Sequence, residues 1–232
     1  LVDHAASEDA WLKAFSIANN WRACHAFPLN SFQVALRQRA NAVSIGSRPP
    51  LIAQRLKRLP AIMHKIDRMK GRLTLSEFQD IGGCRAVLSK ATLIYGLRAK
   101  YLENKRSAHK LVKEDDYLAK PRKTGYRGLH LIYEFVGDER FAGRHIEIQI
   151  RSRLQHAWAT AVETNDLFTG QKLKSNLGDK KWLRFFALMS SVIALRERAA
   201  PVPETPDKET DLAAELKTLE SELRARDRFG TY

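Results

Sequence analysis

The sequence has only two cysteines, Cys24 and Cys84, among its 232 residues. Two cysteines are too few for a disulfide framework or a cysteine-rich zinc site. Both have apolar neighbours, so we expect buried, reduced thiols in a cytoplasmic protein. No apolar run is long enough to span a bilayer, and no segment has the pattern of a signal peptide. The sequence therefore predicts neither a membrane protein nor a secreted one.

The chain also lacks a glycine-rich loop ending in Gly-Lys-Ser or Gly-Lys-Thr, which argues against an ordinary P-loop enzyme. Acidic residues are in the minority: 26 Asp and Glu face 40 Lys and Arg, which gives a net charge of +14. Such an excess favours polyanionic partners, either nucleic acid or nucleotides with several phosphates. A generic solvated basic surface is the alternative.

Predicted strands and helices alternate along the chain without forming regular βαβ units. Strands are expected at 51–58, 80–89, 109–113, 129–135 and 145–151, and helices at 5–26, 31–42, 60–69, 90–103, 153–164 and 179–198. Hydrophobic residues make up 44% of the chain, enough for a real core. The expected fold class is therefore α+β, a mixed β-sheet flanked by helices. A proline-rich linker is predicted at 199–210, and a charged connecting or docking helix at 211–232.

The segment 146–151, Ile-Glu-Ile-Gln-Ile-Arg, alternates apolar and polar residues. In a strand, this alternation buries the isoleucines and places Glu147, Gln149 and Arg151 on the opposite face. A carboxylate, an amide and a guanidinium in a row suit the binding of a metal and a phosphate. The segment 125–130, Gly-Tyr-Arg-Gly-Leu-His, adds Tyr126 and His130 beside a glycine that lets backbone approach a ligand. The simpler alternative is an amphipathic strand with a solvated face.

Two further groups of residues fit phosphate chemistry. Arg55 and Lys57 alternate on one predicted strand, and Lys65 lies on the helix that follows, so these cations can converge on a polyphosphate. Asp80 and Glu147 are candidate Mg²⁺ ligands, because Mg²⁺ typically takes one or two carboxylates plus substrate phosphates. A basic surface strand and structural carboxylates are the competing interpretations.

These segments together resemble the synthetase domain of RelA/SpoT alarmone synthetases. The resemblance rests on Arg-Leu-Lys at 55–57, Asp-Ile-Gly-Gly-Cys-Arg at 80–85 and the segments at 125–130 and 147–151. It covers about residues 50 to 165 and implies a nucleotidyltransferase-like synthetase domain over 1–198. The flanks, such as Leu-Gln-His-Ala-Trp-Ala-Thr-Ala-Val-Glu at 154–163, are similar to toxic small synthetases of toxin–antitoxin and phage-defence systems, CapRel-like toxins included.

The resemblance implies Mg²⁺-dependent transfer of pyrophosphate from ATP to a ribose 3′-hydroxyl. By position, Arg55 and Arg85 would sandwich the adenine, while Lys57 and Lys65 would hold the ATP phosphates. Asp80 and Glu147 would bind the metal, and Glu147 would also help to deprotonate the attacking hydroxyl. The remaining matched residues would bind the acceptor. Tyr126 would stack on its base, and His130 and Gln149 would orient it.

The loop before Tyr126 departs from the family pattern. The family usually has Lys-Pro-Asn-Gly-Tyr, whereas this chain has Lys-Pro-Arg-Lys-Thr-Gly-Tyr at 120–126, with Arg122 and Lys123 as extra cations. We therefore expect an altered acceptor, the 3′ end of tRNA, bound in part by Arg122 and Lys123. The alternatives are GDP or GTP as the acceptor and, from a different class, an inactive nucleic-acid-binding or sensory module. A toxin role would also imply an antitoxin domain or protein as a partner.

Overall fold

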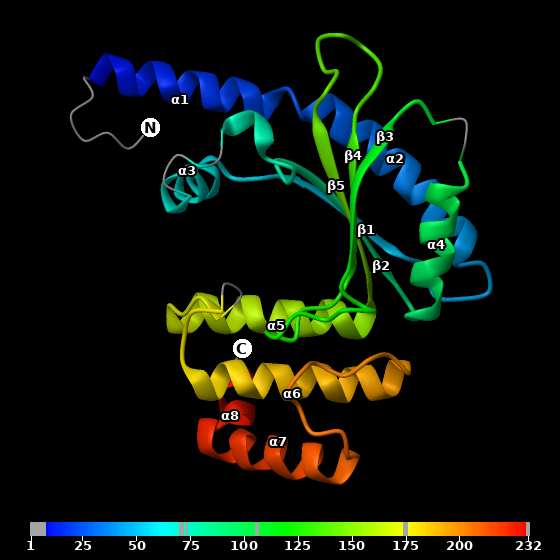
Figure 1. The fold of residues 1–232 in the computed structure, drawn as a ribbon, viewed down its shortest axis with the longest axis vertical. Helices are drawn as coiled ribbons and strands as arrows, with labels where there is room; N and C mark the ends of the chain where they lie inside the picture. The colour runs from blue at the N-terminus through cyan, green and yellow to red at the C-terminus, as the bar shows by residue number, and fades with distance from the viewer. Residues whose placement is uncertain (1–7, 70–71, 73, 105–106, 174–175, 231–232) are drawn as a thin grey trace. The chain divides into compact units, whose positions relative to one another are not determined.

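The computed structural model describes residues 8–69, 72, 74–104, 107–173 and 176–230 (Figure 1). The chain folds into two compact units, the first made of 1–88, 95–115 and 130–150 and the second of 89–94, 116–129 and 151–232. In the described part of the chain, no helix combines the length and the apolar character needed to cross a membrane.

The first unit is built on a five-stranded sheet. The strands lie in the order β1 (Leu51–Leu56), β2 (Gly82–Leu88), β5 (His145–Ser152), β4 (Leu129–Glu134) and β3 (Lys110–Asp116). β1 and β2 are antiparallel, and their register pairs Arg55 with Gly83 and Ala53 with Arg85. The predicted α+β fold class, a mixed sheet with flanking helices, is confirmed.

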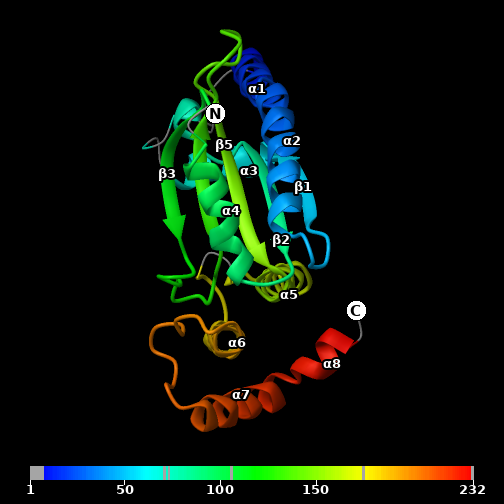
Figure 2. The ribbon, with the colours of Figure 1, turned by 90° about the vertical axis from the view of Figure 1, so that its right-hand side faces the viewer.

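The helices of the first unit lie on both faces of this sheet. They are α1 (Glu8–Ala23), α2 (Ala26–Val43), α3 (Leu59–Arg68) and α4 (Thr92–Leu102). Figures 1 and 2 show α2 and α4 over one face of the sheet and α3 on the other. Leu36 of α2 and Leu97 of α4 are fully buried, as are Ile146, Ile148 and Ile150 of β5, so the core is formed where helix and strand patterns meet.

α2 begins earlier than the sequence predicts. The sequence predicts a helix at 5–26 and the next from 31, but α2 starts at Ala26 and contains Pro28 in its first turn. A proline is tolerated there because the N–H it lacks would have no partner inside the helix. The thiol prediction is likewise half right: Cys84 is buried, whereas Cys24 is only partly buried, and both are free.

The second unit contains α5 (Arg153–Thr169), α6 (Lys180–Glu197), α7 (Glu209–Leu223) and the short α8 (Ala225–Gly230). The apolar side chains of α6 belong to a core, with Trp182, Phe185 and Phe186 buried. The single last helix that we predicted is divided, because Arg224 adopts a left-handed conformation with φ of 47°. Between α6 and α7, Arg184 donates to Glu215 from Nε at 2.6 Å and from Nη2 at 2.8 Å.

The segment between α6 and α7 is held against α6 in this unit. Val202 is 1% exposed, and its N–H donates to Ser191 Oγ at 2.9 Å. The proposed boundaries, a synthetase domain at 1–198, a linker at 199–210 and a docking helix at 211–232, remain a prediction.

Candidate functional site

The side chains of β5 alternate between the two faces of the sheet, as the sequence predicts. Ile146, Ile148 and Ile150 have no exposed surface, whereas Glu147 and Gln149 are partly buried on the opposite face. Because successive side chains of a strand point to opposite faces, burial of the isoleucines fixes where these two polar groups lie. The strand therefore carries a carboxylate and an amide in fixed positions beside β2.

Neighbouring side chains hold the Glu147 carboxylate on both of its oxygens. His130 Nδ1 lies 2.8 Å from Oε1, and Gln149 Nε2 donates to Oε2 at 2.6 Å. Arg85 Nε donates to Gln149 Oε1 at 3.2 Å, which turns the amide so that its NH₂ group faces Glu147. Burial by itself raises the pKa of Glu147, but the His130 and Gln149 contacts outweigh it and leave the pKa below its ordinary value. The carboxylate is thus ionised and oriented.

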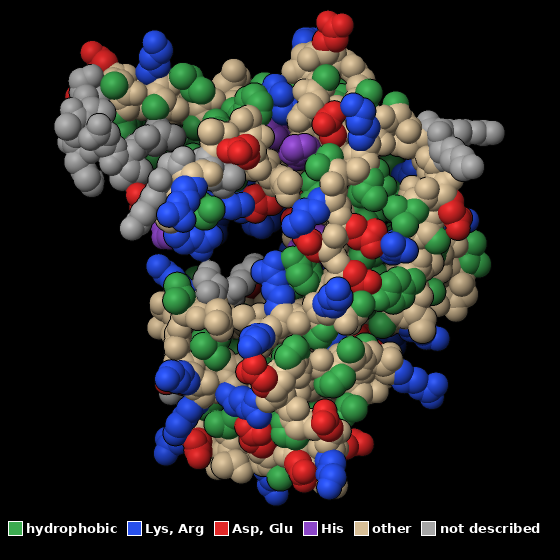
Figure 3. All heavy atoms as spheres, in the orientation of Figure 1, with side chains coloured by type: hydrophobic (Ala, Val, Ile, Leu, Met, Phe, Trp, Pro, Cys, Tyr) green, Lys and Arg blue, Asp and Glu red, His purple; other side chains and the backbone are tan. Residues whose placement is uncertain are grey.

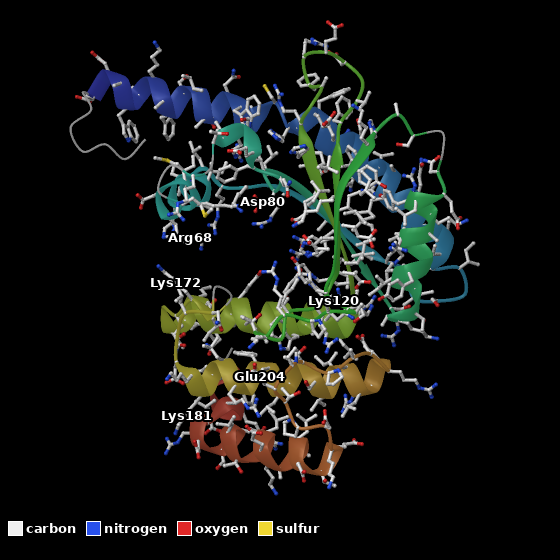
Figure 4. The ribbon with its side chains drawn as sticks, in the orientation of Figure 1. Arg68, Asp80, Lys120, Lys172, Lys181 and Glu204 are labelled. Carbon is white, nitrogen blue, oxygen red and sulfur yellow. The ribbon has the colours of Figure 1, made fainter. Side chains whose placement is uncertain are left out.

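Asp80 lies just before β2, on the α3 side of the sheet (Figure 4). It forms ion pairs with Lys57 Nζ at 2.5 Å and with Lys65 Nζ at 3.1 Å. Burial raises the pKa of Asp80, and the hydrogen bond from Lys57 with the charges of both lysines more than offsets this, so the net pKa is lowered. The two lysines therefore converge on Asp80 as a shared partner, and their binding of a polyphosphate remains a prediction.

Two arginines flank a cavity on this face of the sheet. In the β1–β2 register, Arg55 is opposite Gly83 and Arg85 is opposite Ala53, so the two guanidinium groups are diagonal neighbours on the same face. Each is paired with a residue that has a small side chain or none, Gly83 opposite Arg55 and Ala53 opposite Arg85, so no large side chain from the paired position fills the space beside it. The cavity is lined by Ala53, Gln54, Arg55, Asp80, Gly83, Cys84, Arg85, Glu147 and Gln149.

The carboxylates in this cavity form a donor set that fits Mg²⁺. Asp80 and Glu147 both line the cavity, and the charge of Asp80 raises the pKa of Glu147. The two carboxylates therefore interact electrostatically. Both nevertheless stay ionised, as hard oxygen ligands must. No cluster of three or more His, Cys, Asp or Glu residues suited to a metal occurs among the described residues. Two carboxylates without a full protein cage match the preference of Mg²⁺ for water and substrate phosphates as its other ligands.

Tyr126 lies in the second unit, in a loop whose conformation requires a glycine at position 125. Gly125 has φ of +92°, and an added Cβ would come within 2.8 Å of Trp158 and 3.0 Å of Ser190. Ser190 Oγ donates to the Gly125 carbonyl at 2.6 Å and so pins the loop to α6. Arg151 Nη2 donates to the Tyr126 hydroxyl at 2.6 Å, and its guanidinium carbon is 4.8 Å from the ring centroid. The tyrosine is thereby held in one orientation.

The extra cations of this loop are exposed. Arg122 lies with its guanidinium carbon 4.4 Å from the Tyr117 ring centroid and 5.8 Å from that of Tyr126. Lys123 forms an ion pair with Glu204, and both side chains are exposed. Figure 3 shows lysine and arginine side chains over the visible surface of both units, with acidic side chains between them. The loop therefore presents cations to solvent beside a fixed aromatic ring.

The predicted site residues fall into two groups, one in each unit. The first unit brings together eight of them: Arg55, Asp80, Arg85, Glu147 and Gln149 line the cavity, and Lys57, Lys65 and His130 contact its carboxylates. Tyr126, Arg122 and Lys123 are grouped in the second unit. Sequence reasoning missed the small residues Ala53 and Gly83 and the role of Arg151 as a partner of Tyr126. Ala53 and Gly83 could have been identified from the sequence, because each lies two positions before a predicted adenine-binding arginine.

Comparison with known proteins identifies the region that carries this site. Residues 54–168 match the family described as the region found in RelA / SpoT proteins. A curated relative, the GTP pyrophosphokinase YwaC of Bacillus subtilis, is 32% identical over 112 residues, which are 46% of this chain and 52% of that protein. The chain thus spans about half the length of this relative.

Solved structures share the fold. Small alarmone synthetase 1 from Bacillus subtilis matches with a TM-score of 0.64 at 20% identity, covering 78% of this chain and 92% of that one. Small alarmone synthetase 2 from the same organism matches with a TM-score of 0.60 at 21% identity, covering 81% and 94%. A GTP pyrophosphokinase family protein from Streptococcus pneumoniae gives 0.59 at 17% identity, covering 83% and 91%. The fold is that of the small alarmone synthetases, and residues 54–168 of this chain belong to the RelA/SpoT family.

Proposed function

We propose that this chain is a pyrophosphokinase that uses Mg²⁺ and transfers the β,γ-pyrophosphate of ATP to a ribose 3′-hydroxyl. The observation that carries the proposal is the cavity that joins a slot between Arg55 and Arg85 to the carboxylates Asp80 and Glu147. Two guanidinium groups can stack on both faces of an adenine ring. The carboxylates next to the slot are where a metal ion and phosphates would be needed. The relative named GTP pyrophosphokinase supports the same chemistry.

The environment of Glu147 refines its role in this proposal. Its pKa lies below the ordinary value, since His130 and Gln149 stabilise the ionised form. A carboxylate with a lowered pKa is a weak general base, so we assign Glu147 to metal binding and to orienting the hydroxyl rather than to strong proton abstraction. In this proposal, His130, which contacts Glu147, and Gln149, which Arg85 orients, would position the acceptor. When bound, Mg²⁺ would neutralise charge on the phosphates.

The lysines would change partners when ATP binds. Lys57 and Lys65 both form ion pairs with Asp80. With a nucleotide bound, Lys57 and Lys65 would pair with its phosphate oxygens, and Asp80 would become available to hold the metal. Phosphoryl-type transfer depends mainly on such positioning and charge neutralisation, which this set of side chains supplies.

For the acceptor, we propose the 3′ end of tRNA, in the manner of a toxin that blocks aminoacylation. Support comes from the exposed cations Arg122 and Lys123 beside Tyr126 and from the net charge of +14. A free nucleotide needs few phosphate contacts, whereas a tRNA backbone uses many. A toxin of this kind would need an antitoxin, and this partner, like a cytoplasmic location, is part of the proposal.

A second acceptor, GDP or GTP, is favoured by the comparisons. YwaC is named a GTP pyrophosphokinase, and small alarmone synthetase 1 has been solved with its product pppGpp and with AMPCPP. In this reading, Tyr126 would stack on the guanine, and the chemistry at the cavity would be unchanged.

Acceptor choice is tested by incubating the protein with labelled ATP and GDP, GTP, deacylated tRNA or tRNA that lacks its 3′-terminal adenosine. Transfer to intact tRNA alone supports the tRNA proposal, and transfer only to GDP or GTP replaces it with the alarmone reading. The double variant Arg122→Glu with Lys123→Glu should weaken tRNA modification and leave ATP binding unchanged. The matched control is Lys208→Glu with Lys217→Glu, which changes the net charge by the same amount at two other exposed lysines. Absence of transfer to every acceptor would contradict the pyrophosphokinase proposal itself.

A further inference from the structure

A second cavity lies on the opposite face of the sheet from Glu147. His130 and Tyr133 are three positions apart on β4, so their side chains point to opposite faces. His130 contacts Glu147, whereas Tyr133 points to the face that α2 and α4 cover in Figures 1 and 2. A cavity of about 370 Å³ lies there, lined among others by Phe32, Arg39, Tyr101, His109 and Tyr133. Its volume is in the range of pockets that hold small molecules.

Four aromatic rings are among the side chains that line this second cavity. The rings of Phe32 and His109 are 4.6 Å apart between centroids, and Tyr133 is 5.8 Å from both Phe32 and Tyr101. His109 is held by its Nδ1, which accepts a hydrogen bond from the Val136 N–H at 3.2 Å. The four rings come from α2, α4, the loop before β3, and β4. A planar ligand in the cavity could therefore make stacking and edge contacts on several sides.

One cation dominates the electrostatics of this cavity. The guanidinium carbon of Arg39 is 4.6 Å from the centroid of the Tyr101 ring. Burial is the largest cause of the pKa shifts of His109, Tyr101 and Tyr133, and the charge of Arg39 is a smaller cause in all three. On the pKa of Tyr133, the charge of Glu114 acts in the opposite direction to that of Arg39. No Asp or Glu is among the described residues that line the cavity. Arg39 thus carries the one permanent side-chain charge among the described residues that line the cavity.

Tyr101 adds a hydroxyl that lacks an acceptor. Its side chain is 6% exposed, and the buried hydroxyl has no hydrogen-bond partner of good geometry among the described residues. Arg39, whose guanidinium lies over the Tyr101 ring, can only donate hydrogen bonds. Burial raises the pKa of Tyr101, so the hydroxyl keeps its proton at neutral pH. A buried donor without an acceptor costs free energy, which a ligand oxygen placed in the cavity would recover.

We propose that this second cavity binds a small planar anion, that is, an aromatic or purine ring with one carboxylate or phosphate group. The ring would pack among Phe32, His109 and Tyr133. The anionic oxygens would pair with Arg39 and accept the hydrogen bond of Tyr101. This site is on the other face of the sheet from the Asp80–Glu147 cavity, and it does not depend on the pyrophosphokinase proposal.

Isothermal titration of the full chain with phenyl phosphate, benzoate, AMP and inorganic phosphate tests this proposal. We expect at least one ring-bearing anion to bind, and to bind more tightly than inorganic phosphate. Arg39→Gln should weaken that binding roughly 10- to 100-fold, the usual worth of a hydrogen-bonded charge. Tyr101→Phe, which removes only the hydroxyl, should weaken it roughly 3- to 10-fold. Arg37→Gln, on the exposed side of α2, is the matched control and should leave the affinity unchanged.

The variants also separate this second cavity from the catalytic one. AMP bound in the slot between Arg55 and Arg85 would not respond to Arg39→Gln, whereas AMP bound between α2 and α4 would. Tighter binding of phenyl phosphate than of benzoate identifies a phosphate ligand, and the reverse order identifies a carboxylate. Tyr101→Phe keeps the test valid if Arg39→Gln lowers stability. Failure of every ring-bearing anion to bind at millimolar concentration, or binding that neither variant weakens, would overturn the proposal.

Discussion

Gly83 offers a direct test of the proposed ATP slot. It lies opposite Arg55 in the β1–β2 pair, and an added Cβ would make only ordinary contacts, at 3.7 Å from the Glu147 carbonyl oxygen and 3.9 Å from Oε2. A β-branched residue also suits a strand. Gly83→Val should therefore fold normally, yet its two methyl groups should enter the space where the adenine would lie between Arg55 and Arg85.

The size of the effect follows from the contacts that would be lost. Stacking of a ring on one guanidinium group is worth about 1 to 2 kcal/mol in a partly desolvated site. Loss of both contacts would cost about 2 to 4 kcal/mol, which corresponds to a decrease in kcat/KM for ATP of roughly 30- to 1,000-fold. The loss should appear mainly as a higher KM for ATP, because the variant leaves the carboxylates in place.

Initial rates measured against ATP and acceptor concentration separate this explanation from a disturbed carboxylate. Gly83→Ala, with a single added methyl group, should show a much smaller increase in KM for ATP and serves as the graded control. Thermal unfolding should show that both variants are folded. If kcat at saturating ATP fell while KM for ATP did not change, the valine would be acting on Glu147. If kcat/KM stayed within about threefold of wild type in a folded Gly83→Val protein, adenine would not bind between the two arginines.

Three other predictions address the carboxylates, the tyrosine and a buried histidine. Asp80→Asn or Glu147→Gln should lower turnover by two or more orders of magnitude without unfolding the protein, and near-normal turnover in either would remove that residue from the metal site. Tyr126→Ala should lower kcat/KM for the acceptor about 5- to 150-fold, since base stacking is worth about 1 to 3 kcal/mol, and an equal loss in ATP affinity would contradict acceptor stacking. Burial, with the charges of Arg144 and His145, lowers the pKa of His25 to about 4, despite its hydrogen bond to the Trp21 carbonyl oxygen. Unfolded His25 takes up a proton near pH 6.5, so stability should fall as pH drops from about 6.5 to 4, by at most about 3 kcal/mol. Denaturant unfolding at pH 7 and pH 4.5 should show a smaller difference in His25→Gln than in wild type, and an equal difference would show that His25 does not carry the effect.

The sequence predicted those features of the fold that depend on local periodicity. The alternation at 146–151 correctly predicted that three isoleucines are buried and that Glu147 and Gln149 lie on the opposite face. Helix ends were less predictable, because they depend on single backbone conformations. Pro28 lies within the first turn of α2, and Arg224 ends α7 by adopting a positive φ.

The candidate site was predictable residue by residue, but its pairings were not. Asp80 and Glu147 could be proposed as ligands from residue type and strand position alone. That Lys57 and Lys65 share Asp80, or that Arg85 orients Gln149, depends on strand register and on packing between distant segments. A one-residue change of register would move every side chain of a strand to the other face, so sequence periodicity alone does not determine such contacts.

The chain of contacts from Arg85 through Gln149 to Glu147 suggests how donor and acceptor sites are coupled. Arg85 belongs to the proposed adenine slot, and its Nε also fixes the amide of Gln149, whose NH₂ group donates to the Glu147 carboxylate. If adenine draws the Arg85 guanidinium into the slot, the Gln149 amide becomes free to turn toward the acceptor. ATP binding would then prepare the acceptor site through a side chain that touches both. Arg85→Lys should therefore impair acceptor use as well as ATP binding, because a lysine cannot stack and donate in the same fixed plane. Measured with ATP at saturation, a KM for the acceptor equal to that of wild type would show that Arg85 serves the nucleotide alone.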